Sequence, residues 1–259
     1  MRPSVGILFA VAGLTFALIL TVTRASWLAL LISATVMILL GTSRRTILIA
    51  ATCLVPVVLA GLLVLQRYRH VSFFDQKDPS TTWRQTVWRE GFELLVSKPR
   101  HLLVGVGMDS IKAHWRLWGL FDNGRLPIGH MHSNLLQLAL ERGVPALVVW
   151  LILLGVYARS QLESLRALSK RNPDDAGAGG TPAEKDKNES DSLVLDPGID
   201  RGIVLGALGG LIGFFTSGLV HYNWGDSEVV MIFYFIMGLS LVLARRPENR
   251  SELRGPYEP

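Results

Sequence analysis

Six long apolar stretches without charged residues constrain this chain more than any other feature. Five of them cover residues 3–23, 25–43, 46–66, 202–220 and 229–244. The first three are each about 19 to 21 residues long, enough for a helix to cross a bilayer core of roughly 30 Å. The sixth covers 143–158, and because it is short we expect its helix to begin earlier, near Ser133. The sequence therefore predicts an all-α, polytopic integral membrane protein with about six transmembrane helices.

The composition favours the same class of protein. Hydrophobic residues make up 49% of the chain and charged residues only 18%, whereas soluble domains carry about 25% charge. The basic residues lie in blocks between the apolar stretches, so the net charge of +5 does not indicate a nucleic-acid partner. The single cysteine, Cys53, excludes an intrachain disulfide and a cysteine metal cluster. The first stretch is longer than a signal-peptide core, so we expect a retained helix.

Lysine and arginine in the connecting segments set the predicted orientation. Arg44 and Arg45, the 159–201 connection and the C-terminal tail carry basic residues on one side, which should be the cytoplasm. Both termini are then cytoplasmic. The expected organisation is three transmembrane helices (1–66), one large structured periplasmic loop with an amphipathic helix (67–132), a transmembrane helix (133–158), a disordered cytoplasmic linker (159–201), two transmembrane helices (202–244) and a cytoplasmic tail (245–259).

The amphipathic helix of the large loop carries one notable arginine. Asp78-Pro-Ser-Thr-Thr is typical of a helix start, and Lys98-Pro99 of a helix end. On a helical projection the apolar residues between them share one side, and Arg84 lies in the middle of it. A buried guanidinium needs an anionic partner. Either Arg84 snorkels or pairs with Asp75 or Asp78, or it faces an anionic substrate, since its planar fork suits phosphate.

All six histidines lie outside the predicted spans and on the outer side, and two of them stand close together. His130 and His132 are two residues apart, and no third ligand of suitable spacing indicates a metal site. His132 comes just before a predicted helix, whose N-terminal dipole disfavours an imidazolium. A neutral imidazole there can take a proton from a hydroxyl. The alternative is a helix-capping or interfacial histidine. We expect His130 to face elsewhere.

Three segments of the sequence carry a family resemblance. They are Thr23-Arg24-Ala25-Ser26-Trp27 at the start of a span; Trp83-Arg84 through Trp88, followed by Pro99 and a tight turn at Gly105-Val-Gly107; and His130-Met-His132-Ser-Asn134-Leu-Leu-Gln137 through Glu141-Arg-Gly143-Val-Pro145. Over roughly residues 20 to 160 they resemble the O-antigen ligase/polymerase family of bacterial polytopic membrane glycosyltransferases. Family members usually have about twice as many spans, so the chain is expected to correspond to their C-terminal half.

The resemblance implies a metal-independent, inverting transfer of a glycan from an undecaprenyl-pyrophosphate carrier at the periplasmic face of the inner membrane, without a cofactor. It assigns Arg24 and Arg84 to the pyrophosphate and His132 to the catalytic base, with His130, Asn134 and Gln137 in support. The chemistry is consistent with these roles. A leaving pyrophosphate needs positive charge, and the acceptor hydroxyl needs a base.

The partners follow from the same resemblance: the carrier-linked glycan, lipid A–core or another glycan as acceptor, membrane lipids, and no nucleic acid. Two alternatives stay open. An O-antigen or exopolysaccharide polymerase of the same family would use the same donor with another acceptor. A non-enzymatic membrane transport subunit would place charged residues inside its spans, and the spans here are almost uncharged.

Overall fold

The computed structural model describes residues 3–21, 23–41, 79–170 and 197–244, and every regular element in these ranges is helical. The predicted all-α class is therefore confirmed for this part of the chain. The helices are α1 (Pro3–Leu20), α2 (Arg24–Gly41), α4 (Pro79–Val96), α5 (Pro99–Val104), α6 (Ser110–Trp118), α7 (Leu120–Gly124), α8 (Asn134–Arg142), α9 (Val144–Lys170), α10 (Pro197–Gly218), the short 3₁₀ helix η2 (Asn223–Gly225) and α11 (Ser227–Ala244).

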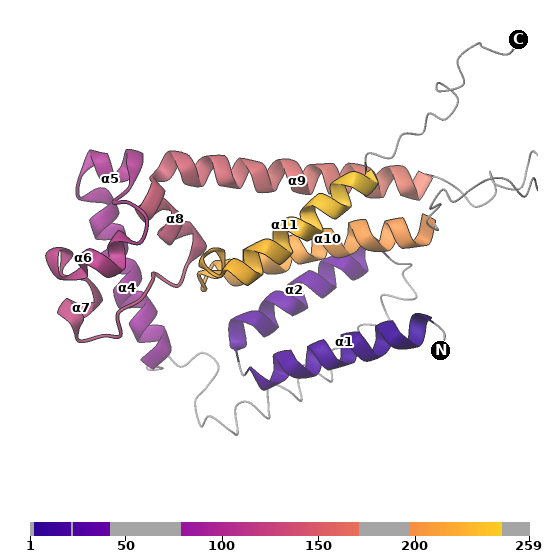
Figure 1. The fold of residues 1–259 in the computed structure, drawn as a ribbon, viewed down its shortest axis with the longest axis horizontal. Coiled ribbons are helices and arrows are strands. Elements are labelled where there is room, and N and C mark those ends of the chain that lie inside the picture. The colour runs from indigo at the N-terminus through magenta and orange to yellow at the C-terminus, as the bar shows by residue number, and fades with distance from the viewer. Residues whose placement is uncertain (1–2, 22, 42–78, 171–196, 245–259) are drawn as a thin grey trace, which may run out of the picture.

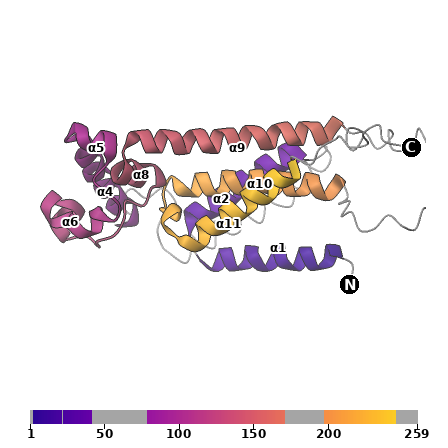
Figure 2. The same ribbon diagram turned by 45° about the horizontal axis from the view of Figure 1, so that its top comes forward.

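The helices form a bundle with a unit of shorter helices at one end. Helices α1, α2, α9, α10 and α11 run roughly along the long axis of the molecule, and α4 to α8 gather beyond the end where α9 begins (Figures 1 and 2). Helix α10 packs against α2, α9 and α11. The apolar core between α9, α10 and α11 includes Trp150, Leu154, Leu208, Leu211 and Phe214. We call the part from α4 to α8 the terminal unit.

Two of the described helices are long and apolar enough to cross a membrane. They cover Val144–Leu168 within α9 and Arg201–Gly218 within α10. Shorter apolar helices cover Ala25–Gly41 and Ser227–Val242. The predicted span 46–66 and the tail 245–259 lie outside the described residues. The six-span topology remains a prediction.

The helix predicted to run unbroken from near Ser133 to residue 158 is in fact two helices. Helix α8 ends at Gly143, which has a φ of +86°, and α9 begins immediately afterwards. A side chain at position 143 would collide with the backbone carbonyl of Leu103, so the close approach of α5 requires glycine at this break. Helix α9 then continues to Lys170, so the first part of the predicted linker 159–201 is helical. Residues 171–196 lie outside the described part.

Helix α4 anchors the terminal unit, and its bounds lie close to those predicted. Its buried residues are Val87, Gly91, Leu94 and Leu95, all on the predicted apolar side. They belong to a core that includes Ile111, Leu120, Phe121, Met131 and Leu140. On the other side of α4, the Glu90 carboxylate accepts hydrogen bonds from the backbone N–H groups of Phe121 (2.7 Å) and Asp122 (3.0 Å). This core and these bonds fix α4 relative to the loop before α8.

Candidate active site

A cavity of about 710 Å³ lies between the start of α4 and the loop that precedes α8. It brings together Arg84 and His132, two of the residues that sequence analysis assigned to chemistry. Its lining consists of Pro79, Ser80, Thr82, Trp83, Arg84, Thr86, Leu126, Pro127 and His132. A guanidinium and an imidazole on one cavity wall can bind an anion and accept a proton in the same space.

Arg84 reaches this cavity because it lies on the apolar stripe of α4, one turn before Val87. The buried residues of α4 begin only at Val87, so Arg84 lies outside the core of the terminal unit and is half-buried. Its Nη1 donates a 2.7 Å hydrogen bond to Ser80 Oγ and a 3.4 Å bond to the Ser80 carbonyl. The carboxylates Asp75 and Asp78, considered as partners from the sequence, lie outside the described residues.

The backbone around His132 is held by its neighbour Met131, which is completely buried. The Met131 N–H donates to Gln137 Oε1 at 2.8 Å, and its carbonyl accepts from Trp88 Nε1 at 2.7 Å. His132 has a φ of +47°, a left-handed conformation that is uncommon for residues other than glycine. The helix cap of α8 is Ser133, whose Oγ accepts from the Leu136 N–H. His132 is therefore not the capping residue.

The His132 ring lies in a cluster of aromatic and imidazole rings. The centroid of the Trp83 ring lies 4.7 Å away in an edge-to-face arrangement. His130 is 4.2 Å away and His221 is 6.1 Å away. The expectation that His130 faces elsewhere is thus wrong. With Met131 turned into the core and position 132 left-handed, both imidazoles emerge on the same side.

The surroundings keep these imidazoles neutral. The pKa of His132 is lowered to about 4, first by burial and then by His130, Arg84 and His221. Burial is also the main cause that lowers the pKa of His130, with Lys112 adding to it against Asp226 and Glu141. Burial and Arg84 lower the pKa of His221. At neutral pH His132 is therefore unprotonated, the state that a general base requires.

Sequence analysis missed the contribution of the loop between α10 and α11. This loop supplies His221, and it supplies Tyr222, whose ring lies 5.4 Å from that of His130. His221 Nε2 and His132 Nδ1 are buried and have no hydrogen-bond partner within the described residues. The outer-side placement of His221 was visible in the sequence. Its contact with His132 spans almost ninety positions, and no local pattern indicates it.

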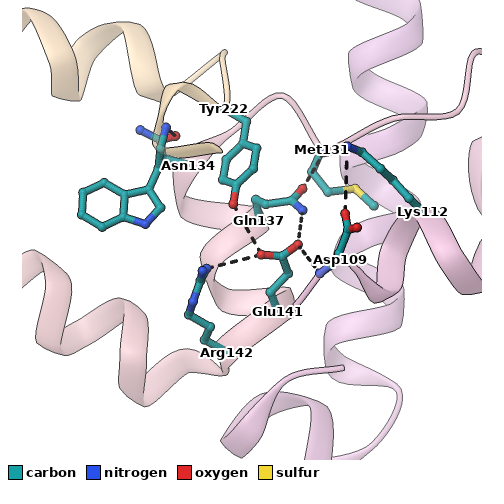
Figure 3. A network of polar contacts seen from close by, with 9 residues as sticks. Asp109, Lys112, Met131, Asn134, Gln137, Glu141, Arg142 and Tyr222 are labelled. Carbon is teal, nitrogen blue, oxygen red and sulfur yellow. Dashed lines mark hydrogen bonds and ion pairs between the residues drawn. The ribbon is translucent and has the colours of Figure 1, made fainter. Parts of the chain in front are cut away.

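Glu141 is the centre of a buried polar network that joins the pieces of the site (Figure 3). Its Oε1 accepts from Gln137 Nε2 at 2.8 Å and from the Asp109 N–H at 3.1 Å. Its Oε2 lies 3.3 Å from Arg142 Nη1, and it accepts a 3.4 Å bond from the Tyr222 hydroxyl. Glu141 thus connects the His132 loop, through Gln137, with the loop that carries His221.

Asn134 holds the second of these loops in place. It is 2% exposed, and its Oδ1 accepts a 3.1 Å hydrogen bond from the Trp224 N–H. Its amide also lies against Gly218 at the end of α10. Asn134 and Gln137 therefore bind backbone groups of the chain itself, and neither lines the cavity.

The other predicted site features lie apart from this cluster. His101 Nδ1 lies 2.9 Å from the Leu94 carbonyl at the end of α4, His114 is exposed, and His70 lies outside the described residues. Arg24 is the first residue of α2, which begins at the end of the bundle nearer the terminal unit (Figure 1). Its role stays a prediction. Within the described ranges no group of three His, Cys, Asp or Glu side chains could hold a metal ion.

In the described residues, the fold and the cavity define a class of protein: a helical chain with apolar helices of membrane-spanning length and an enzyme-like polar site at their end. A family model places the chain more closely. The O-antigen ligase family matches residues 9–151, more than half of the chain, so the chain belongs to this family of membrane-associated, glycosyltransferase-like ligases and polymerases. No curated protein and no solved structure matches it. The matched range contains Arg84 and His132 and stops before the loop of His221.

Proposed function

We propose that this chain transfers a glycan from an undecaprenyl-pyrophosphate carrier to lipid A–core or a similar acceptor at the periplasmic face of the inner membrane. One observation carries the proposal. Arg84 and His132 line the same cavity, and burial keeps the imidazole of His132 neutral. The family match supports the general activity, and the two side chains support the choice of donor and the direction of proton transfer.

In the proposed reaction His132 acts as the general base. The acceptor hydroxyl attacks the anomeric carbon of the donor sugar, and the bond between that carbon and the pyrophosphate oxygen breaks. His132 takes the hydroxyl proton, while Arg84 binds the pyrophosphate as its negative charge develops. Arg24 is proposed as a second cation for the same group. Attack opposite the leaving group inverts the anomeric configuration, and these residues need no metal for either task.

Residues around His132 hold its backbone and its ring in position. Gln137 holds the Met131 backbone and thereby the left-handed His132. Trp83 packs edge-on against the His132 ring, and His130 lies against it from another direction. These contacts restrict the imidazole to a narrow range of positions, which a general base requires.

Reconstitution with defined substrates tests the proposal. Purified protein in vesicles receives a carrier-linked glycan together with either lipid A–core or a second carrier-linked repeat. Glycan attached to lipid A–core supports the ligase function, whereas extension of only the carrier-linked repeat would identify a polymerase. Absence of both products with wild-type protein that binds the donor would contradict glycan transfer by this chain. His132→Ala is the matched inactive control.

A further inference from the structure

Helix α9 contains an apolar segment long enough to cross a membrane, Val144–Leu168, but only the first part of this segment is free of charged residues. This charge-free part runs from Val144 to Ala158, and Arg159 follows. At about 1.5 Å per residue this part covers roughly 22 Å, less than a hydrocarbon core of roughly 30 Å. Arg159 is 81% exposed and pairs with Glu163 at 2.8 Å, which marks one limit of the charge-free part. Because the charge-free part is shorter than the hydrocarbon core, apolar surface beside the start of α9 can lie in the same apolar layer.

Helix α5 presents such a surface next to the start of α9. Leu103 is 62% exposed and Val104 is 59% exposed. Helix α5 contacts both α8 and α9, and the Leu103 carbonyl lies directly against Gly143. Both views place α5 beside the first turn of α9 (Figures 1 and 2). The exposed apolar side chains of α5 therefore extend the exposed apolar side of α9, where Val149 is 66% exposed.

This apolar surface continues to α4 through a groove. The groove has a volume of about 390 Å³ and joins Phe92 and Leu95 of α4 to Leu136 of α8, Leu147 of α9 and Leu219 at the end of α10. Phe92 is 58% exposed, and Val96, one turn later on the same helix, is 48% exposed. Several large apolar side chains exposed together on one edge of the terminal unit indicate a surface that contacts another molecule or a membrane.

The charges on this edge fit a lipid headgroup layer. Lys98 and Arg100 are exposed between α4 and α5, the sequence from Val96 to Met108 contains no acidic residue, and Glu93 beside Phe92 pairs with Arg89 of the same helix. Basic side chains next to apolar ones can reach lipid phosphates while their neighbours enter the acyl region. A second copy of the chain would bury Lys98 and Arg100 in an interface to which the segment 96–108 contributes no acidic partner. A bilayer suits the surface better.

We propose that the α4–α5 edge, defined as Phe92, Val96, Leu103 and Val104, is inserted into the outer leaflet of the bilayer. Lys98 and Arg100 lie at the level of the phosphates. The proposal rests on the periplasmic placement of the terminal unit in the proposed function. It adds the α4–α5 edge to the transmembrane helices as a second part of the chain that contacts lipid. Helix α4 runs across the bundle axis (Figure 1) and carries Arg84 near its other end. Anchoring α4 in the interface thus holds the cavity beside the headgroup layer, where a lipid-linked pyrophosphate lies.

Spin labels report the depth of this edge without any measurement of activity. Full-length protein with Cys53→Ser receives one cysteine at Leu103, Val104, Val149 or Leu117, and each variant is labelled in nanodiscs. Val149 on α9 is the buried-in-lipid reference. Leu117 on α6 is the matched control, since it is apolar and 76% exposed but lies outside the edge. We expect the labels at 103 and 104 to collide more with oxygen than with a water-soluble nickel chelate, as at 149, and the reverse at 117.

Other outcomes would overturn the proposal. Labels at 103 and 104 that prefer the nickel chelate, while the label at 149 prefers oxygen, would place the edge in water. Strong spin–spin broadening at 103 would show a second copy on the surface instead of lipid. Oxygen preference at 117 as well would mean that the whole terminal unit enters the membrane. Because none of these readouts depends on glycan transfer, they separate failure of this proposal from failure of the proposed function.

Discussion

Gln137 donates a 2.8 Å hydrogen bond from its amide to Glu141 Oε1, one helical turn away and inside the protein, where the two residues are 3% and 6% exposed. The other end of the Gln137 amide accepts from the Met131 N–H. A buried carboxylate thus orients an amide, and the amide fixes the backbone next to His132. The spacing of glutamine and glutamate in this segment is explained by this relay rather than by contact with the cavity.

Replacing Glu141 by alanine should therefore cost stability as well as activity. The change leaves the Asp109 N–H, the Gln137 amide and the Tyr222 hydroxyl without their shared acceptor. Buried groups that lose a partner cost about 3 kcal/mol in total at such a site. A thermal unfolding scan in detergent should show a clearly lower Tm. Glu163→Ala is the control, because the partner of that exposed carboxylate in the described part of the chain is exposed Arg159, and its Tm should not change. Equal Tm values for both variants would contradict the relay.

Gly143 should be intolerant of even a methyl group. Its φ is +86°, and a Cβ would meet the backbone of Leu103 and Val104, which cannot move aside as a side chain can. Gly143→Ala should destabilise the protein by roughly 1 kcal/mol from the conformation alone, and more from the collision. Gly155→Ala in α9 meets no atom within 4 Å and should be neutral or slightly stabilising. Thermal scans of the two variants compare them directly, and a tolerated Gly143→Ala would argue against the observed break.

The predicted topology gives a third test. A phosphatase reporter fused near Asp122 should be active because the terminal unit is predicted to be periplasmic, and a fusion within 172–198 should be inactive. Helix α9 is the membrane-spanning candidate that lies between these two points of the chain. The opposite pattern of activities would reverse the orientation and move the proposed chemistry to the other side of the membrane.

The helices that the sequence predicted well are those with strong local signals. Helix α4 begins at Pro79, within the predicted start Asp78-Pro-Ser-Thr-Thr, and ends at Val96, before Lys98-Pro99. The break at Gly143 was missed because the apolar periodicity continues across it. What requires the break is the backbone of Leu103, forty positions earlier, and contacts of this kind leave no mark in a local window.

The candidate site was predictable only in part for the same reason. Arg84 and His132 were singled out by an arginine on an apolar face and by a histidine before a helix, and the family resemblance placed them together. The direction of His130 depends on the left-handed backbone at His132, which nothing in the neighbouring residues indicates. His221 and Tyr222 reach the site through packing between distant helices, so their contribution needed the three-dimensional structure.

Arg84 should be essential for glycan transfer, whereas Arg89 on the same helix should not. Arg84→Ala removes the cation of the cavity and should reduce glycan transfer by about 10² to 10³-fold. Arg84→Lys keeps the charge but loses the bidentate geometry, so its activity should still fall strongly. Arg89 on the same helix is 71% exposed and pairs with Glu93, and Arg89→Ala should behave as wild type. Initial rates in the reconstituted assay, with membrane insertion checked for each variant, distinguish pyrophosphate binding by Arg84 from a snorkelling role. Full activity of Arg84→Ala would leave only the snorkelling role.

The histidine cluster predicts a shift in pH dependence. A general base must be unprotonated, so kcat/KM should be flat near neutral pH and fall only as the pH drops through the His132 pKa of about 4. In acid, where His130 becomes protonated, its charge lowers that pKa, and its ring packs against the His132 ring. His130→Ala removes this charge and lets water approach, so the His132 pKa should rise. The acid limb of the profile should then move to higher pH, while activity at pH 8 is largely kept.

The pH profile of His132→Ala should differ from that of His130→Ala. His132→Ala should lower the rate by about 10² to 10⁴-fold at every pH and abolish the acid limb, while donor binding persists. His114→Ala, at an exposed histidine of the same unit, should leave both the rate and the limb unchanged. Equal and small effects at positions 130 and 132 would exclude His132 as the base. Loss of donor binding in His132→Ala would instead place this imidazole among the groups that bind the pyrophosphate, next to Arg84.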